Sequence, residues 1–243
     1  MKVTLIAQTM GSPAFYDVMV GKDWFPSSHR DGEQLIEFAG RACYQSWHKP
    51  NPATADTADY IANVLAQRHF SVVEHSSVSF YIEDVSRSLT HELVRHRHFS
   101  YSQLSQRFVD MSGARPVVHP SVRGDNAAED ILHRGFIAAL THYDAMVEHL
   151  KTTRPDMERK QVREVARELL PNCTPTSLIV SGNLRSWLEF VEKRCSPAAD
   201  AAIREVSLDI LAKLKDELPS VFGQQVDVGA EQRAPQPEYL GQP

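Results

Sequence analysis

Thirteen consecutive residues concentrate positive charge and hydrogen-bond donors in a chain that is acidic as a whole. Residues 95–107 have the sequence RHRHFSYSQLSQR, with three arginines and two histidines, whereas the 243-residue chain has a formal net charge of −5. The planar guanidinium of arginine binds phosphate in a bidentate fashion, and serine and glutamine add donors suited to phosphate oxygens or a polar heterocycle. The segment therefore predicts a site that binds an anionic ligand in a fixed orientation.

A solvated helix face is the simpler explanation for part of this pattern. Arg87, His91 and Arg95 are spaced i, i+4, i+8 and would form one stripe on a helix, as charged residues exposed to water often do. Against this, residues 87–107 hold four arginines and no lysine, which favours oriented recognition over a diffuse positive field. Further arginines that could bind the same anionic ligand are Arg163, Arg167, Arg185 and Arg194.

Common cofactor and nucleophile motifs do not account for the segment. His91 and His96 are five residues apart, whereas a zinc-binding HExxH helix needs a spacing of four, so no metal site is predicted. The chain has no GxGxxG, no P-loop and no GxSxG, and with 11 glycines it must hold phosphates mainly by side chains. Cys43, Cys173 and Cys195 form no CxxC, and we expect reduced thiols, with Cys43 and Cys195 buried and not nucleophilic.

The elements that must position these residues are a mixture of strands and helices without a βαβ rhythm, which predicts an α+β fold with a mainly antiparallel sheet flanked by helices. After a strand at 2–7 we expect a loop-rich stretch to about residue 31. Ser86 should cap a helix that carries Leu89, Leu93 and Val94 inward, and 101–109 should be irregular or extended. The other expected strands are 76–85 and 174–182. The other expected helices are 32–42, one from residue 54 or 56 toward 69, 126–151, 156–170, 184–193 and 198–217.

Composition predicts one globular domain over residues 1–223, followed by a disordered tail over 224–243. The opening MKVTLIAQT lacks the features of a signal peptide, and no segment has 18 uninterrupted apolar residues, so we expect a cytoplasmic protein without membrane contact. The acidic net charge argues against a protein whose whole surface binds nucleic acid.

The spacing R-H-R-x-x-S-x-S-x-x-S-x-R in residues 95–107 closely resembles the signature of the flavin-dependent thymidylate synthases, in particular the actinobacterial members. The usual signature has Asn at the position of Ser102 and often Glu at that of Gln103. The resemblance extends over most of residues 35–220 and includes EFAGRACYQS, RHFSVVEH, REVARELLP and GNLRSW.

This resemblance implies the α+β fold of the thymidylate synthase-complementing proteins in a homotetramer with active sites between subunits. It implies a methyltransferase that makes dTMP from dUMP in dTMP biosynthesis, with 5,10-methylenetetrahydrofolate as one-carbon donor, FAD as bound cofactor and NADPH as reductant. No nucleic acid partner is implied.

Site residues follow from the resemblance position by position. It places dUMP against Glu92, Arg95, Gln103, Leu104, Ser105, Gln106, Arg107, Arg167 and Arg194. It places FAD against Ser71, Arg95, His96, Arg97, Gln103, Asn183, Arg185 and Glu189, with Tyr44 and His69 near the flavin and folate. Ala198 departs from the family, since many members have His four residues after the arginine that corresponds to Arg194.

Arg194 is the residue that we expect to activate the substrate, because a guanidinium against the uracil edge stabilises negative charge when N3 ionises. Ser105 lacks an adjacent base in the sequence, so we assign it to binding and not to nucleophilic attack. An alternative of a different class is a module that binds RNA or nucleotides through these arginines, Phe99 and Tyr101 without chemistry.

Overall fold

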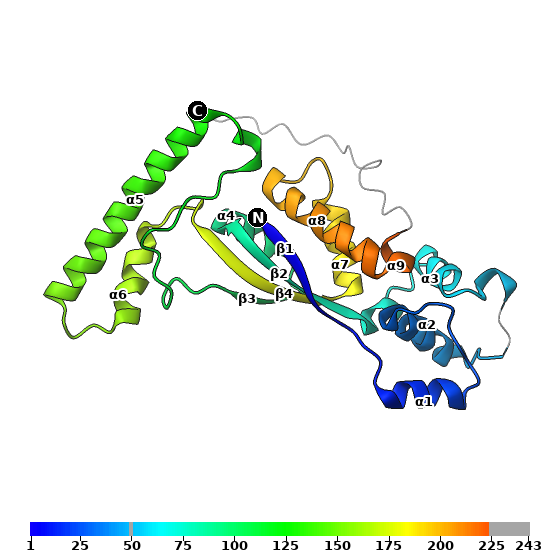
Figure 1. Ribbon diagram of the computed structural model, residues 1–243. Helices are drawn as coiled ribbons and strands as arrows, with labels where there is room; N and C mark the ends of the chain where they lie inside the picture. The colour runs from blue at the N-terminus through cyan, green and yellow to red at the C-terminus, as the bar shows by residue number, and fades with distance from the viewer. Residues whose placement is uncertain (49–50, 224–243) are drawn as a thin grey trace, which may run out of the picture.

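The sheet is the centre of the computed structural model, which describes residues 1–48 and 51–223 (Figure 1). Its four strands, β1 (Lys2–Gln8), β2 (Ser77–Ser86), β3 (Ser100–Gln103) and β4 (Pro175–Asn183), lie in the order β1-β2-β4-β3. All three pairings are antiparallel. This confirms the predicted α+β fold with an antiparallel sheet, whereas the predicted tail at 224–243 lies outside the described residues.

One face of the sheet carries the main core. Along β2, Val78, Phe80 and Ile82 are buried while the residues between them are more exposed, as the alternating pattern predicts. The helices α7 (Leu184–Arg194) and α8 (Ala201–Glu217) pack on this face, and Trp187 of α7 meets the ring of Phe80 edge-on at 5.0 Å. The core therefore holds α7 against the sheet, whose strand β3 belongs to the arginine-rich motif.

Two helical units extend the molecule beyond the sheet (Figure 1). At one end lie α1 (Pro13–Gly21), α2 (Asp31–Tyr44), α3 (Thr57–Ala66) and the short α9 (Pro219–Phe222). At the other end the 28-residue α5 (Asn126–Thr153) runs beside α6 (Arg159–Ala166), and these helices pack on a small core of their own. Short 3-10 turns occupy Pro52–Thr54, Val72–His75, Pro120–Val122 and Arg167–Leu169.

The helix α4 (Arg87–Leu93) connects β2 to the arginine-rich motif. The Oγ of Ser86 accepts a hydrogen bond from the backbone N–H of Leu89 at 3.1 Å, which confirms the predicted cap. The helix ends at Leu93, so Arg95 does not continue the stripe of Arg87 and His91, and that part of the prediction is wrong. Val94 is also wrong as a core residue, because it is 42% exposed in the turn that follows.

Three other expectations differ from the structure. The stretch expected to be a loop contains α1, whose Pro13 occupies the first helical turn, where proline loses no hydrogen bond, after the cap of Ser12. The helix expected over 156–170 is α6 followed by a 3-10 turn. Cys43 is exposed at the end of α2, whereas Cys195 is fully buried as predicted.

Candidate functional site

Arg194, at the end of α7, is the centre of a hydrogen-bonded cluster with the segment after α4. Its Nε donates to Nε2 of His96 at 2.9 Å, and one Nη donates to the carboxylate of Glu92 at 3.0 Å. The other Nη donates to the backbone oxygen of Glu92 at 3.3 Å. Three of the five N–H groups of the guanidinium are thus used within the protein, and two remain for a ligand.

His96 is held in its neutral form. Burial, with the adjacent positive charges of Arg194 and Lys193, lowers its pKa from 6.5 to about 4. Its ring packs edge-on against Phe190 at 5.0 Å. A neutral imidazole that accepts at Nε2 carries its hydrogen on Nδ1, so the histidine acts as an acceptor for Arg194 and adds no charge to the site.

A cavity of about 280 Å³ opens beside this cluster. Arg95, His96, Arg97, Glu189 and Arg194 line it, so the structure brings together five of the residues predicted to bind ligands. Lys193 forms an ion pair with Glu189, and this hydrogen bond lowers the pKa of the Glu189 carboxyl. Positive charge exceeds negative charge on these walls, as a site for an anionic ligand requires.

Tyr101 supports the turn that carries His96, and the sequence analysis assigned it no such role. Its hydroxyl lies 2.7 Å from the backbone oxygen of Leu93 and 2.8 Å from that of His96. Burial raises the pKa of this hydroxyl to about 12, so it stays protonated as a donor. Only the tertiary structure reveals this role, because the sequence shows Tyr101 simply as an aromatic residue within a polar segment.

Gln103, at the end of β3, contacts two buried threonines that the sequence analysis did not single out. Its Nε2 donates to Oγ1 of Thr90 in α4 at 3.0 Å and to Oγ1 of Thr176 in β4 at 3.3 Å. These bonds fix the side chain of Gln103 across the junction of β3, β4 and α4.

The residues after Gln103 form a turn at the edge of the sheet. The N–H of Leu104 donates to the backbone oxygen of Ser177 at 2.9 Å, and the backbone oxygen of Ser105 accepts from Phe108 and Val109. Gln106 is buried, and Arg107 lies 3.9 Å from the carboxylate of Glu164. No basic side chain bonds to the hydroxyl of Ser105 within the described residues, in agreement with a binding role.

The downstream arginines divide into two kinds. Arg167 stands near Arg87, and the pKa of Arg87 is lowered by burial and by the charge of Arg167, so these two cations lie close together. Arg163 does not join them. It is only 8% exposed, and it donates to the backbone oxygen of Phe108 at 2.7 Å and to the carboxylate of Asp110 at 2.6 Å. Its role is to fasten α6 to the chain after the motif.

A second group of predicted FAD residues surrounds the start of α7. The Oδ1 of Asn183 caps the helix by accepting from the N–H of Ser186 at 3.0 Å. Arg185 forms an ion pair with Glu74, which lies in the 3-10 turn that directly follows Ser71. Asn183, Arg185 and Ser71 are thus gathered at one place, and no hydrogen bond links them to Arg194 in the described part of the chain.

Tyr44 and His69 do not line the cavity beside Arg194, although His69 precedes Ser71 by only two residues. Tyr44 is 78% exposed at the end of α2, and His69 is exposed after α3. Neither side chain makes a hydrogen bond or ion pair within residues 1–48 and 51–223. The structure therefore does not bring them to the Arg194 cluster, and their predicted place near flavin and folate stays a prediction.

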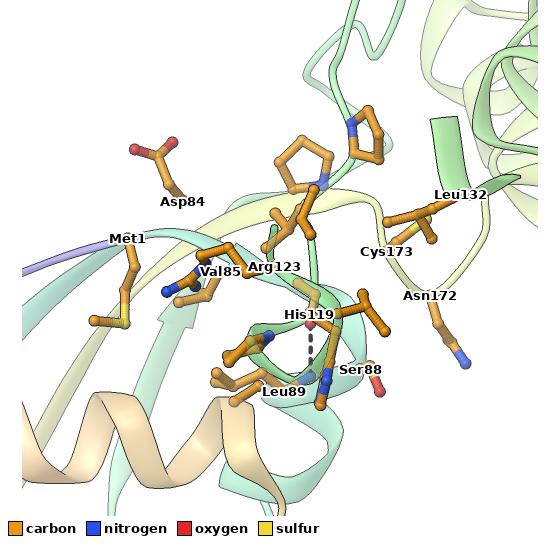
Figure 2. Close-up of a pocket in the computed structure, with 18 of the residues that line it drawn as sticks. Met1, Asp84, Val85, Ser88, Leu89, His119, Arg123, Leu132, Asn172 and Cys173 are labelled. Carbon is orange, nitrogen blue, oxygen red and sulfur yellow. Dashed lines mark hydrogen bonds between the residues drawn. The ribbon is translucent and has the colours of Figure 1, made fainter. Parts of the chain in front are cut away.

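A larger cavity, of about 910 Å³, lies elsewhere in the molecule (Figure 2). Figure 2 shows Met1 and Val85 on one side of it and Leu132 and Cys173 on the other. Its walls are mostly apolar, and none of the residues predicted to bind dUMP or FAD lines it. Size alone therefore does not identify the site, whereas the convergence of charged and hydrogen-bonding groups on Arg194 does.

Within residues 1–48 and 51–223, no group of three or more His, Cys, Asp or Glu side chains is arranged to hold a metal ion. None of the helices described is both long and apolar enough to cross a membrane.

Comparisons with known proteins identify the family of this chain. The model of the family described as thymidylate synthase complementing protein matches residues 27–220. A flavin-dependent thymidylate synthase of Mycobacterium avium (strain 104) is 46% identical over 228 residues, which cover 91% of this chain and 88% of the relative. The corresponding enzyme of Mycobacterium marinum is 48% identical over 196 residues, which cover 79% and 78%.

The fold has a solved counterpart. The crystal structure of thymidylate synthase X from Helicobacter pylori, determined with FAD and dUMP, superposes with a TM-score of 0.63 at 19% sequence identity. The superposition covers 91% of this chain and 97% of that chain. With a matching family model and relatives of this identity and coverage, the chain belongs to the flavin-dependent thymidylate synthases, the family of thymidylate synthase complementing proteins.

Proposed function

We propose that this enzyme makes dTMP from dUMP with FAD as bound cofactor, 5,10-methylenetetrahydrofolate as one-carbon donor and NADPH as reductant. The observation that carries the proposal is the cluster in which Arg194 is held by Glu92 and His96 beside a cavity lined by Arg95 and Arg97. Family membership makes FAD its cofactor and disfavours the alternative of a nucleic acid-binding module without chemistry.

The side chains of the two groups suit FAD in their chemistry. Arg95 and Arg97 in one group and Arg185 in the other offer guanidinium forks that fit the oxygens of a pyrophosphate. When bound, FAD would supply the hydride that reduces the transferred carbon to a methyl group. Gln103, Asn183, Ser71, His96 and Glu189 are the other residues that we propose to hold it.

Arg194 would act on the pyrimidine of dUMP. Methylation at C5 needs electron density at that carbon, and the density rises when N3 loses its proton. The two free N–H groups of Arg194 can face the uracil edge and stabilise the resulting negative charge, an effect worth about 3 kcal/mol for a well-placed donor in a dry site. Arg95, Arg107 and Arg167, with Gln103, Leu104, Ser105, Gln106 and Glu92, would bind the rest of dUMP.

A thiol nucleophile has little support. Burial raises the pKa of Cys173 and of Cys195, so neither forms a thiolate readily. Cys43 is exposed but does not line the cavity beside Arg194. We therefore propose that C5 is activated through Arg194 without a cysteine that adds to C6.

The cavity beside Arg194 is small for a nucleotide and a flavin together. A cavity of about 280 Å³ lies below the usual range for a pocket that encloses a drug-sized ligand, and FAD is larger still. This supports the proposal of a homotetramer with active sites between subunits. The domain limits 1–223, the cytoplasmic location and the folate contacts of Tyr44 and His69 stay predictions.

The test is the visible spectrum of the purified protein, followed by NADPH oxidation. We expect a yellow protein with flavin absorbance, and faster NADPH oxidation when dUMP is present. A colourless protein that also fails to take up added FAD would refute the proposal.

A further inference from the structure

The orientation of the Gln103 amide is determined by a chain of hydrogen bonds. Thr90 is only 3% exposed, and its hydroxyl lies 2.8 Å from the backbone oxygen of Arg87. A carbonyl oxygen can only accept, so the hydrogen of the Thr90 hydroxyl points at Arg87. The oxygen of Thr90 must therefore accept from its other neighbour, which is the amide of Gln103 at 3.0 Å.

The amide nitrogen of Gln103 is then fully used. The nitrogen and oxygen of an amide look alike in shape, so the partners must decide which one faces the threonines. The reversed orientation would set the amide oxygen against the lone pairs of Thr90, with no hydrogen between them. In the observed orientation Nε2 donates to both Thr90 and Thr176, the latter 4% exposed, and Oε1 accepts no hydrogen bond within the described residues.

We propose that Thr90 and Thr176 are positioning residues that present Gln103 to the bound nucleotide as an uncharged hydrogen-bond acceptor. This inference rests on the proposed function, in which Gln103 contacts dUMP and FAD. It adds that Gln103 selects a ligand group with a hydrogen to donate, a sugar hydroxyl or a ring N–H. If its amide turned to meet an acceptor, the buried oxygen of Thr90 would lose the N–H that it accepts, while the Thr90 hydrogen stayed directed at Arg87.

The chain offers a closely matched control for Thr90. Thr174 is also fully buried, and its hydroxyl donates to the backbone oxygen three residues earlier, that of Pro171, at 2.6 Å. It makes no hydrogen bond to Gln103. Thr90→Val and Thr174→Val therefore remove the same kind of hydroxyl and the same kind of backbone bond, and only the first releases the amide. Thr90→Ser keeps the acceptor and should behave as the unaltered enzyme.

The experiment measures dissociation constants for three pairs of ligands, each pair differing in one donor. On the FAD-loaded enzyme, dUMP is compared with 2′,3′-dideoxyuridine monophosphate, which lacks the sugar hydroxyl, and with N3-methyl dUMP, which lacks the ring N–H. On the flavin-free enzyme, FAD is compared with N3-methyl FAD. The ligand pair between which Thr90→Val no longer discriminates identifies the ligand group that contacts Gln103.

We expect the unaltered enzyme to prefer the parent ligand about tenfold in at least one pair, the value of one net hydrogen bond. Thr90→Val should lower that preference at least about threefold, while Thr174→Val and Thr90→Ser keep it. Equal behaviour of Thr90→Val and Thr174→Val, or no preference in any pair, would overturn the inference. If instead the unaltered enzyme bound neither dUMP nor FAD, the proposed function itself would fail, so the two failures are distinguishable.

Discussion

The Nε of Arg194 donates to Nε2 of His96 across 2.9 Å, and this bond joins two segments 98 residues apart in the chain. Arg194 ends α7, which is fixed to the sheet by Trp187 and Phe190, and His96 lies in the turn held by Tyr101. With Glu92 as the other partner, the bond sets the plane of the guanidinium before any ligand arrives. Preorganised donors of this kind cost no rearrangement during the reaction.

Arg194→Ala should lower dTMP formation by about a hundredfold or more, because the donor aimed at the uracil edge is lost. Flavin reduction by NADPH should survive in part, since it does not need charge at the pyrimidine. Single-turnover dTMP formation and anaerobic flavin bleaching measure the two steps separately. Lys213→Ala is the control and should leave both rates unchanged, because Lys213 is a half-buried cation on α8 that pairs with Asp209 and does not line the cavity. Equal loss of both rates in Arg194→Ala would indicate a structural role.

The neutral state of His96 predicts how stability depends on pH. The pKa is about 4 in the folded protein and near 6.5 in the unfolded chain, so the unfolded chain binds more protons between these values. Stability contributed by this group is therefore complete above about pH 6.5 and is lost as the pH falls toward 4. Thermal unfolding at pH 7 and pH 5 should show a smaller loss of Tm for His96→Gln than for the unaltered protein.

The control for this measurement is His91→Gln. His91 is exposed on α4, and its replacement should leave the drop in Tm between pH 7 and pH 5 as it is in the unaltered protein. A His96→Gln variant whose Tm falls as steeply as that of His91→Gln would contradict the prediction.

Much of the fold could be predicted because its signals are local. The alternation along β2 and the apolar spacing of α8 depend only on neighbouring residues. The prediction missed α1 because Gly11 and Pro13 together indicate a loop, unless Pro13 is taken as the first residue of a helix. It extended α4 inward through Val94, because nothing in the sequence shows that the chain turns after Leu93 to bring His96 to Arg194.

The site was predictable in its residue types and not in its partners. The arginine-rich motif indicates an anion site, and Arg194 and Glu92 follow from the family resemblance. That Thr90 and Thr176 orient Gln103 depends on α4 and β4 meeting at the same side chain, and Thr176 is 73 positions from Gln103 in the chain. Arg163 shows the converse, because its spacing from Arg167 suggested a ligand residue, whereas Phe108 and Asp110 already use its donors.

Arg163→Ala should lower the free energy of unfolding by about 2 kcal/mol or more, because charged hydrogen bonds to Phe108 and Asp110 are lost and a buried side chain leaves a void. Chemical denaturation followed by circular dichroism measures the change. Arg134→Ala on α5 is the control, because Arg134 pairs with Asp130 in solvent, and we expect a change below about 0.5 kcal/mol. If the two variants were equally stable, the hydrogen bonds of Arg163 would not stabilise the contact between α6 and the chain after the motif.

Gly182 in β4 leaves room for the ring of Phe99, which lies near the turn that carries His96. A Cβ at this position would overlap the ring of Phe99, which packs on Trp187 with ring centres 4.3 Å apart. Gly182→Ala must therefore displace Phe99, three residues after His96, and we expect it to lower the free energy of unfolding by about 1–3 kcal/mol. Flavin uptake should weaken as well, because the turn that carries His96 and Arg97 would shift with Phe99.

Gly135→Ala on α5 is the matched substitution. A Cβ there meets no atom within 4 Å, and alanine is favoured over glycine inside a helix by up to about 1 kcal/mol. Chemical denaturation should therefore show opposite signs for the two glycine-to-alanine changes, and flavin titration should show a loss for Gly182→Ala alone. A Gly182→Ala protein as stable as Gly135→Ala would mean that Phe99 can move freely, and the aromatic cluster would then not hold the His96 turn in place.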